Sequence, residues 1–406
     1  MTDFARSAAS GAAEDVTSRI GEYLASHGGP FFELQRRLGA LEEEALHAGR
    51  RAAIFVTLSW GVPLLLALFA GRAFGPADSH PYLLDFGAWA RFFIATALFV
   101  LAEQQVEYGL RGKLGQLVRA PIIAPGSRKA GAEAVVQALK LRDSGVAEIV
   151  CLGLAIAGTI AFLVNLTVVE SSTWAVEVSA DGAHVTLAGW WTVICSAPFF
   201  YFLLARGLWR YLIWAQLLWR LASLELRLVA THPDGKAGLA FLGEYPNAYS
   251  MFVFGMSSAI AVTVVRHVFD ANISSVTFAY IIGSWLAIVF AFFAFPLLAF
   301  SKPLAELKER SEQILGAQAT RFHRAAERAL VGRNLVADDP SEADAGEPVP
   351  DPSAQFAASR KLSVVLMNRS AIAPLAGAAL VPFAIAGATK LPYKEVFSLV
   401  KKLLVL

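Results

Sequence analysis

The chain has 406 residues, of which 56% are hydrophobic and 17% are charged, and its mean hydropathy is +0.52. Soluble domains carry about 45–50% apolar and about 25% charged residues, so this composition excludes an ordinary soluble protein. The net charge of +2 provides no global field that would attract nucleic acid, so we expect no nucleic-acid partner. Both cysteines lie inside apolar blocks without CxxC or Cys/His ligand spacing, and we therefore expect buried thiols and no metal site.

The N-terminal segment, residues 1–51, is charged throughout and lacks the apolar region and cleavage site of a signal peptide. We expect this segment to be cytoplasmic, with an amphipathic helix over 30–50 that runs into the first span. Six apolar blocks of the length needed to cross about 30 Å of hydrocarbon follow it. They predict a transmembrane domain over 52–300, with spans at 52–71, 86–102, 147–169, 187–205, 248–268 and 276–300.

The distribution of positive charge predicts the orientation of these spans. Of the 35 Lys and Arg residues, all but Arg72, Arg91 and Arg266 fall in segments on one side of a six-span topology. Positively charged loops remain in the cytoplasm. We therefore expect both termini to be cytoplasmic and the protein to lie in a bacterial inner (plasma) membrane, with the lipid bilayer as its main partner.

Two features between the spans have recognisable patterns. Residues 174–187 (WAVEVSADGAHVTL) alternate between apolar and polar around Asp181–Gly182, which is typical of a small β-hairpin. We expect this hairpin on the extracytoplasmic side, where it leans on helix ends. On the cytoplasmic side, residues 103–142 contain two helical stretches that are separated at 120–126 by two prolines.

The sequence after the sixth span has three parts. Residues 301–335 predict a charged cytoplasmic helix, 336–360 an acidic, proline-rich disordered linker, and 361–406 a C-terminal re-entrant or interfacial segment. Within the last part, residues 371–389 are long enough to span, but two prolines and two glycines interrupt them. Four lysines follow, and a full span would place these outside. We therefore favour a re-entrant or interfacial hairpin and a surface helix over 392–406. The fold class is an all-α polytopic membrane protein with cytoplasmic helical extensions.

Four arginines form the first candidate site. Apolar character continues past the fourth span to residue 229, so we expect this helix to project into the cytoplasm. At 100° per residue its arginines share a stripe about 100° wide. Such a stripe can line a vestibule that concentrates anions, or it can be an interfacial face that contacts lipid phosphates and nearby acids. The four residues are Arg206, Arg210, Arg220 and Arg227.

The second candidate site is the segment that follows this helix. Pro233 and Gly235 are suited to a tight turn that redirects the chain. His232, Asp234 and Lys236 could form a proton-sensitive or ligand-contacting loop at the inner mouth of a pore. The alternative is a structural turn, in which Asp234 caps the next short helix. One histidine and one aspartate are too few ligands for a metal ion.

The same segment carries a resemblance. Residues 231–243 (THPDGKAGLAFLG) resemble a THPD-x-x-GGL-x-FL pattern of uncharacterised bacterial multi-pass membrane proteins that have comparable C-terminal apolar hairpins. Ala237 stands where the pattern has the first glycine of its pair. The resemblance implies a bacterial origin and a constrained loop, and it implies no particular activity.

The remaining motifs bear on the class of function. The sequence contains no Walker A, GxSxG, HExxH or GxGxxG motif, so we expect no enzyme, no catalytic residue and no cofactor. Pro198 and Pro296 are expected to kink the fourth and sixth spans and to act as hinges or gates. The sequence favours an oligomeric channel or channel-like transporter for a small ion, with an anion favoured and a homo-oligomer expected. The alternative is a non-catalytic membrane scaffold or sensor that docks a cytoplasmic protein partner.

Overall fold

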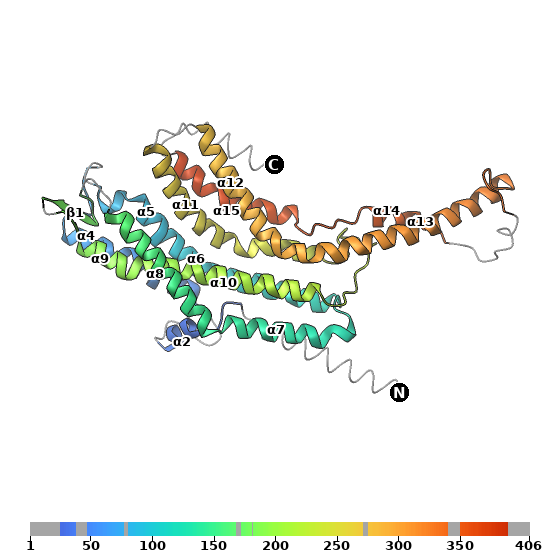
Figure 1. The fold of residues 1–406 in the computed structure, drawn as a ribbon, viewed down its shortest axis with the longest axis horizontal. Coiled ribbons are helices and arrows are strands. Elements are labelled where there is room, and N and C mark those ends of the chain that lie inside the picture. The colour runs from blue at the N-terminus through green and yellow to red at the C-terminus, as the bar shows by residue number, and fades with distance from the viewer. Residues whose placement is uncertain are drawn as a thin grey trace.

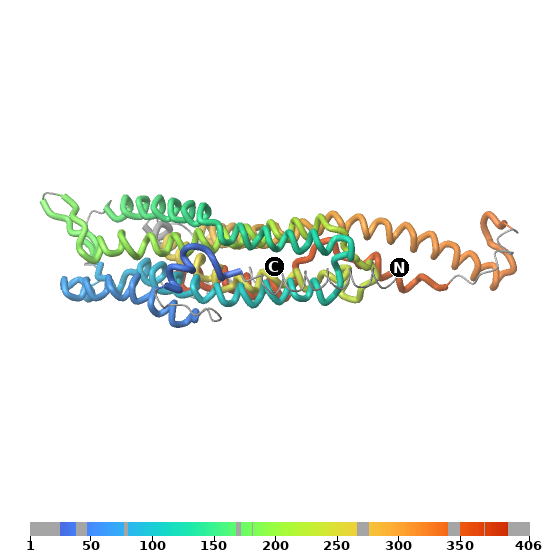
Figure 2. Tube along the Cα trace, turned by 90° about the horizontal axis from the view of Figure 1, so that it is seen from below, coloured from blue at the N-terminus to red at the C-terminus, as the bar shows by residue number. Residues whose placement is uncertain are grey.

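The computed structural model describes residues 25–37, 47–76, 80–167, 172–180, 182–270, 275–339 and 350–388. The molecule is an elongated bundle of helices with one small β-hairpin (Figure 1). Two perpendicular views agree that one long helix, α13 (Ser301–Val331), continues well beyond the bundle as an arm (Figures 1 and 2). The expected surface helix over 392–406 and most of residues 1–51 lie outside the described residues.

Three helical runs that contain π-helical segments form one part of the bundle. The first run consists of α3 (Ala48–Val56), η1 (Thr57–Gly61) and α4 (Val62–Phe69). The second consists of α5 (Phe86–Ala88), η4 (Trp89–Ala95) and α6 (Thr96–Arg119), and a 3-10 turn, η3 (Tyr82–Leu84), precedes it. The third consists of α9 (Leu187–Trp191), η6 (Thr192–Ser196) and α10 (Ala197–Ala222). The segments η1, η4 and η6 are π-helical.

The other elements complete the bundle and its extensions. Helix α2 (Pro30–Arg37) precedes the first run, and η5 (Pro125–Ser127), α7 (Arg128–Arg142) and α8 (Gly145–Thr167) lie between the second and third. The chain then forms η7 (Ala240–Tyr249), α11 (Ser250–Asp270), α12 (Ser275–Ala294) and η8 (Phe295–Phe300). After the arm come α14 (Ser353–Arg360) and α15 (Arg369–Ala388).

Seven of the described helices are long and apolar enough to cross a membrane. They are Ala48–Phe69, Phe86–Arg119, Gly145–Thr167, Leu187–Ala222, Ala240–Val265, Val276–Val331 and Ser370–Ala388. Their outward surfaces are apolar: on α8, for example, Val146 is 72% exposed and Ile149 is 69% exposed. Because so much exposed apolar surface is suited to lipid and not to water, the chain is a multi-pass membrane protein.

The seventh of these helices corrects one prediction. Residues 371–389 were expected to turn back as a hairpin, but α15 is one continuous helix through Pro374 and Pro382. Pro374 has no N–H to offer the carbonyl of Ser370, four residues before it. The side-chain amide of Asn247 donates to that carbonyl at 3.3 Å, so the helix continues through the first proline without losing this hydrogen bond.

Two further predictions were wrong in their boundaries. Helix α10 ends at Ala222, so Arg227 does not lie on it. Arg227 instead follows a short bridge between Ile123 and Leu226, and its N–H donates to the carbonyl of Ile122 at 2.7 Å. The predicted linker, 336–360, contains helix α14, which packs beside α13 where Phe356 meets Gly316.

The predicted β-hairpin is confirmed. Strand β1 (Val176–Ser179) pairs antiparallel with β2 (Gly182–Val185), and Asp181 lies outside the described residues. The hairpin is anchored to the nearby helix ends, as expected for so small a sheet. The indole of Trp174 donates to Asp85 at 2.8 Å, and Arg72 forms an ion pair with Glu177 at 2.7 Å.

Candidate functional site

The central feature of the bundle is a group of buried charges at which several helices meet. Arg206, on α10, is only 3% exposed. Its guanidinium donates to Glu103 of α6, and its Nε lies 3.4 Å from Glu148 at the start of α8. Two arginines besides Arg206 contact Glu103: Arg51 Nη1 lies 2.7 Å from Oε2, and Arg210 Nη1 lies 3.3 Å from Oε1. Arg51, Glu103, Glu148, Arg206 and Arg210 together are called the arginine cluster.

The arginine cluster carries an excess of positive charge. Its three arginines outnumber its two glutamates, which gives a formal charge of +1 if all five are ionised. Buried charges are tolerated only where they are paired and hydrogen-bonded. Glu103 is the ion-pair partner of three guanidinium groups at once, and it accepts hydrogen bonds from two of them, Arg206 and Arg210. Arg210 Nη2 is buried and has no hydrogen-bond partner among the described residues. Arg51 Nη1 also lacks a hydrogen bond among the described residues, but it is ion-paired to Glu103 at 2.7 Å, so Arg210 Nη2 is the donor of the cluster without either kind of contact there.

The segment over residues 25–37 covers the cluster. The N–H of Ser26 donates to Glu107 at 2.7 Å, and its hydroxyl donates to the carbonyl of Glu103 at 2.6 Å. Further along, the N–H of Phe31 donates to Glu148 at 2.7 Å. The side chain of Gln35 accepts from Arg51 Nε at 2.7 Å. This segment, called the N-terminal cover, is thus held to charged residues of α3, α6 and α8.

Two glycines allow the cover to approach so closely. Gly28 and Gly29 have φ values of +84° and +89°, in the left-handed region that residues with a side chain rarely adopt. A Cβ atom at Gly29 would lie 2.5 Å from Glu148 Oε1. The ring of Phe31 then lies over the guanidinium of Arg206, 5.2 Å from centroid to Cζ, as a cation–π contact.

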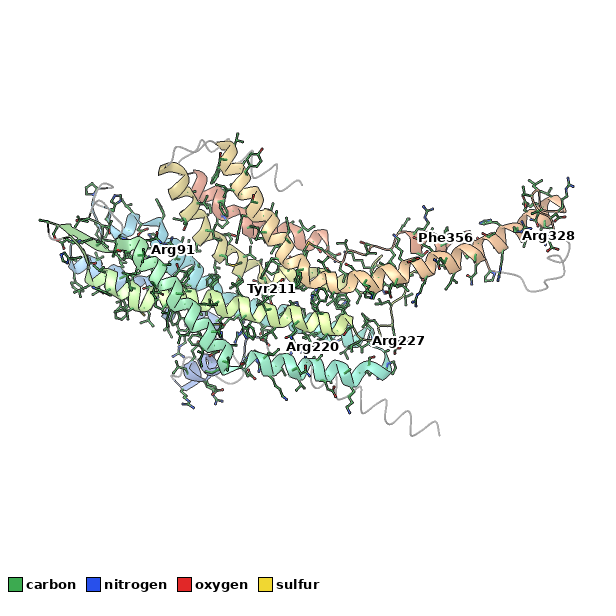
Figure 3. The ribbon with its side chains drawn as sticks, in the orientation of Figure 1. Arg91, Tyr211, Arg220, Arg227, Arg328 and Phe356 are labelled. Carbon is green, nitrogen blue, oxygen red and sulfur yellow. The ribbon has the colours of Figure 1, made fainter. Side chains whose placement is uncertain are left out.

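The structure divides the predicted arginine stripe into two parts. Arg206 and Arg210 belong to the arginine cluster, whereas Arg220 is half-buried near the end of α10 and Arg227 is exposed beyond it. Arg220 lies about 15 Å along the helix axis from Arg210. Figure 3 places Arg220 and Arg227 near the end of α10 that lies beside α7. The four arginines therefore do not line one continuous surface of this subunit.

The loop with His232, Asp234 and Lys236 is held by hydrogen bonds within the protein. Asp234 accepts from the backbone N–H groups of Lys236, Gly238 and Ala240, at 2.8, 3.1 and 3.1 Å. His232 Nδ1 lies 2.9 Å from Asp234 Oδ1. Burial by itself raises the pKa of Asp234, but the three N–H groups and His232 outweigh it, and the pKa lies below its ordinary value.

Lys236 connects this loop to the C-terminal part of the chain. Its ammonium donates to the carbonyl of Leu366 at 2.6 Å, to that of Met367 at 3.1 Å, and to the side chain of Asn368. Burial lowers the pKa of Lys236, and Asp234 partly opposes this effect. The N–H of Ser363 also donates to the carbonyl of Gly235 at 2.9 Å. The three candidates therefore form a clamp, called the Lys236 clamp, that fixes the chain just before α15.

The predicted hinges lie at real irregularities in the helices. Pro198 is the second residue after the π-helical segment η6, and Pro296 lies within the 3-10 segment η8. Pro296 cannot donate to the carbonyl of Phe292. Tyr211 of α10 donates its hydroxyl to that carbonyl, and Tyr245 donates to the carbonyl of Phe293. The Pro296 break is therefore held in place by two tyrosines.

The buried partners of Arg206 could not be predicted from the sequence. Arg51, Glu103 and Glu148 come from three segments far from α10, and each residue alone resembles an ordinary charge at the end of a span. The sequence does show one property that these three residues share: each stands at the end of its predicted span, and the three ends lie on the same side of the predicted membrane.

Among the described residues, no group of three His, Cys, Asp or Glu side chains could hold a metal ion. Comparisons with protein-family models, curated proteins and solved structures found no match for this chain.

Proposed function

We propose that the protein is an oligomeric channel or channel-like transporter for a small anion, closed at its cytoplasmic mouth by the N-terminal cover. The observation that carries this proposal is the excess positive charge of the arginine cluster, together with the unsatisfied Arg210 donor. Arginine side chains that line a constriction favour anions. In this conformation the cover occupies the approach to the cluster, so we assign the structure to a closed state.

The contacts of the cover favour a segment that can leave the arginine cluster over one that covers it permanently. The cover is joined to the bundle by hydrogen bonds to charged groups, through Ser26, Phe31 and Gln35, and the Phe31 ring also packs against aromatic rings of the bundle. Hydrogen bonds to charged groups contribute about 1.5–3 kcal/mol each, and water can take the place of the cover at these groups when the cover leaves. Departure of the cover would leave Glu148 and Arg51 with unused hydrogen-bonding capacity facing an entering ion and its water.

Ion flux from proteoliposomes tests the proposal. Vesicles that contain the wild-type protein should release chloride faster than potassium. Gly29→Ala, whose Cβ would collide with Glu148, should displace the cover and increase chloride release. Arg210→Gln should reduce the preference for chloride, whereas Arg227→Gln, at an exposed position outside the cluster, should behave as wild type. The absence of flux for either ion in both wild type and Gly29→Ala would reject the channel.

Membrane orientation belongs to the same proposal. We infer a bacterial inner membrane and cytoplasmic termini from the distribution of positive charge in the sequence. The seven candidate spans would place the termini on opposite sides if all of them crossed fully. We propose that α15 enters the bilayer beside α11 without carrying the four C-terminal lysines across. Labelling of a cysteine at Ser398 by an impermeant reagent in intact cells would contradict this topology.

A scaffold or sensor is the second candidate, and the arm favours it. Along α13 only Leu304 is fully buried, and the helix projects far from the bundle (Figure 1). Near its tip, Leu330 and Val336 are 87% and 77% exposed. Exposed apolar side chains on an ordered element are typical of a protein interface. A photo-crosslinker at Leu330 that captures one defined partner in cells, in a protein that conducts no ion, would favour this function.

A further inference from the structure

Three neighbouring helical runs contain π-helical segments that contact one another. These segments are η1, η4 and η6, and both η4 and η6 pack against η1. The hydroxyl of Ser59 joins two of the runs, because it lies 2.6 Å from the carbonyl of Phe55 and 2.9 Å from that of Phe92. Well under 1% of residues in globular proteins are π-helical, so three adjacent segments are far from a chance arrangement. Together they are called the π collar.

A π-helical turn contains one residue more than an α-helical turn, and it changes which carbonyls are bonded along the helix. In the π collar, side chains from outside η1 bond to two of its carbonyls. The indole of Trp191 donates to Leu58 at 2.9 Å, and the hydroxyl of Tyr82 donates to Trp60 at 2.9 Å. Ser196, fully buried in η6, has a hydroxyl without a hydrogen-bond partner among the described residues. The collar is thus built on specific contacts, and one of its polar groups remains unsatisfied.

The same three runs supply four of the five residues of the arginine cluster. Arg51 lies in the run with η1, Glu103 in the run with η4, and Arg206 and Arg210 in the run with η6. The fifth residue, Glu148, comes from α8, which is α-helical throughout. Every run with a π-helical segment therefore places at least one charge in the cluster.

We infer that the π collar is a register switch for the arginine cluster. Each π-helical segment holds one additional residue, and conversion of that segment to α-helix shifts the adjoining part of its helix by one position. A shift of one position turns that part by about 100° and moves it by about 1.5 Å. A turn of this size removes Arg51, Glu103 or Arg206 from the cluster. This inference rests on the proposed role of the N-terminal cover as a gate, since loss of a cluster charge would release the cover.

Deletion of one residue tests the switch without any measurement of ion flux. Ile194, in η6, is 71% exposed, so its removal costs little packing. Without Ile194, η6 can become α-helical while α9 and α10 on either side keep their present register. The arginine cluster and the N-terminal cover then stay in the closed arrangement. Leu58, in η1 and 40% exposed, provides a second deletion. Ile156, 50% exposed in α8, is the matched control, because α8 has no additional residue to lose.

The readout is the rate at which a maleimide labels the N-terminal cover. A reporter cysteine is placed by Ala25→Cys, at a buried position of the cover, with Cys151→Ala and Cys195→Ala as background. We expect both collar deletions to give a folded protein by size exclusion and thermal unfolding. They should slow labelling by about tenfold or more, because the opening that exposes the reporter is blocked. The α8 deletion should misfold or label faster.

Two results would overturn the inference. If both collar deletions misfold as the α8 deletion does, the π-helical segments contain no dispensable residue. If they fold but label at the wild-type rate, the cover opens without a register shift. Failure of the channel is a separate result, since labelling is measured in detergent and requires no ion movement.

Discussion

Tyr211 donates its hydroxyl to the carbonyl oxygen of Phe292, the carbonyl that Pro296 leaves without a helical partner. The two rings also stack, with centroids 4.0 Å apart. Asn247 and Ser370 have the same relationship at Pro374, where a side-chain amide serves the freed carbonyl. Both helices therefore pass a proline because a neighbouring helix supplies the missing donor, as is common inside membranes.

Removal of the hydroxyl at Tyr211 should weaken the Pro296 region. Tyr211→Phe leaves the part-buried Phe292 carbonyl without this donor, at a cost of about 1–3 kcal/mol. We expect a lower midpoint of thermal unfolding in detergent and faster amide exchange over 292–300. Tyr108→Phe, at a position that is 70% exposed, is the control and should change neither quantity. Equal stability of the two variants would show that the hydrogen bond contributes nothing.

Neutralisation of Glu103 should destabilise the fold more than any other single change in the cluster. Glu103→Gln leaves Arg51, Arg206 and Arg210 without their common counter-ion. Removal of one partner from a buried ion pair costs about 3–5 kcal/mol. Thermal unfolding would measure this loss, and Glu309→Gln, an exposed position on the arm, provides the control. A loss no greater than that of the control would mean that water already screens the cluster.

Substitution of Lys236 should release the chain before α15. Lys236→Met removes three hydrogen bonds, to Leu366, Met367 and Asn368, while it keeps most of the aliphatic contact area. We expect limited proteolysis to cut within 361–368 faster than in the wild type. Lys302→Met, at a position with an 85% exposed side chain, should be cut at the wild-type rate. Unchanged cleavage in Lys236→Met would show that α15 is held by its packing alone.

The Lys236 clamp should also respond to acid through Asp234. The folded protein lowers the pKa of Asp234 below the ordinary value of 3.8, so the unfolded state binds a proton more readily. The resulting stability is complete above that ordinary pKa and is lost as the pH falls through the lower, folded value. The protection of the Gly238 and Ala240 amides against exchange, relative to the unfolded chain at the same pH, should therefore fall below pH 4 in the wild type. In Asp234→Asn the protection of these amides should be low and should show no such pH step.

The apolar spans and the β-hairpin could be predicted from sequence because each depends on a local pattern. Blocks of apolar residues mark the helices around Phe92 and Phe200 whatever their neighbours are, and alternation around Gly182 marks the hairpin. The continuity of α15 could not be predicted, because the donor that serves Ser370 lies more than 100 residues away on η7. A proline in the sequence predicts a break in the helix unless the side chain that donates to the freed carbonyl is known.

The arginine cluster shows the same limit at the candidate site. The helical wheel placed Arg206 and Arg210 on one face correctly, but that face was interpreted without its neighbours. In the structure, Glu103 and the N-terminal cover bury this face, and its two arginines belong to an ion-pair network. The π collar had only an incomplete sequence signal: Pro63 and Pro198 stand just after η1 and η6, but η4 is followed by no proline, and a proline does not by itself specify an i+5 hydrogen bond. Its position became visible only when the three helices were packed together.

The arm has a mechanical consequence. Helix α13 contains 31 residues, or about 46 Å of rod, and it continues from η8 without a loop. A sideways displacement of about 5 Å at its tip is therefore a rotation of about 6° at the Pro296 joint. Tyr211 and Tyr245 resist that rotation at the joint, where they donate to the carbonyls of Phe292 and Phe293. A force on the far end of this helix thus acts on the tyrosine hydrogen bonds inside the bundle, together with the contacts that α13 makes with Leu362 and α14.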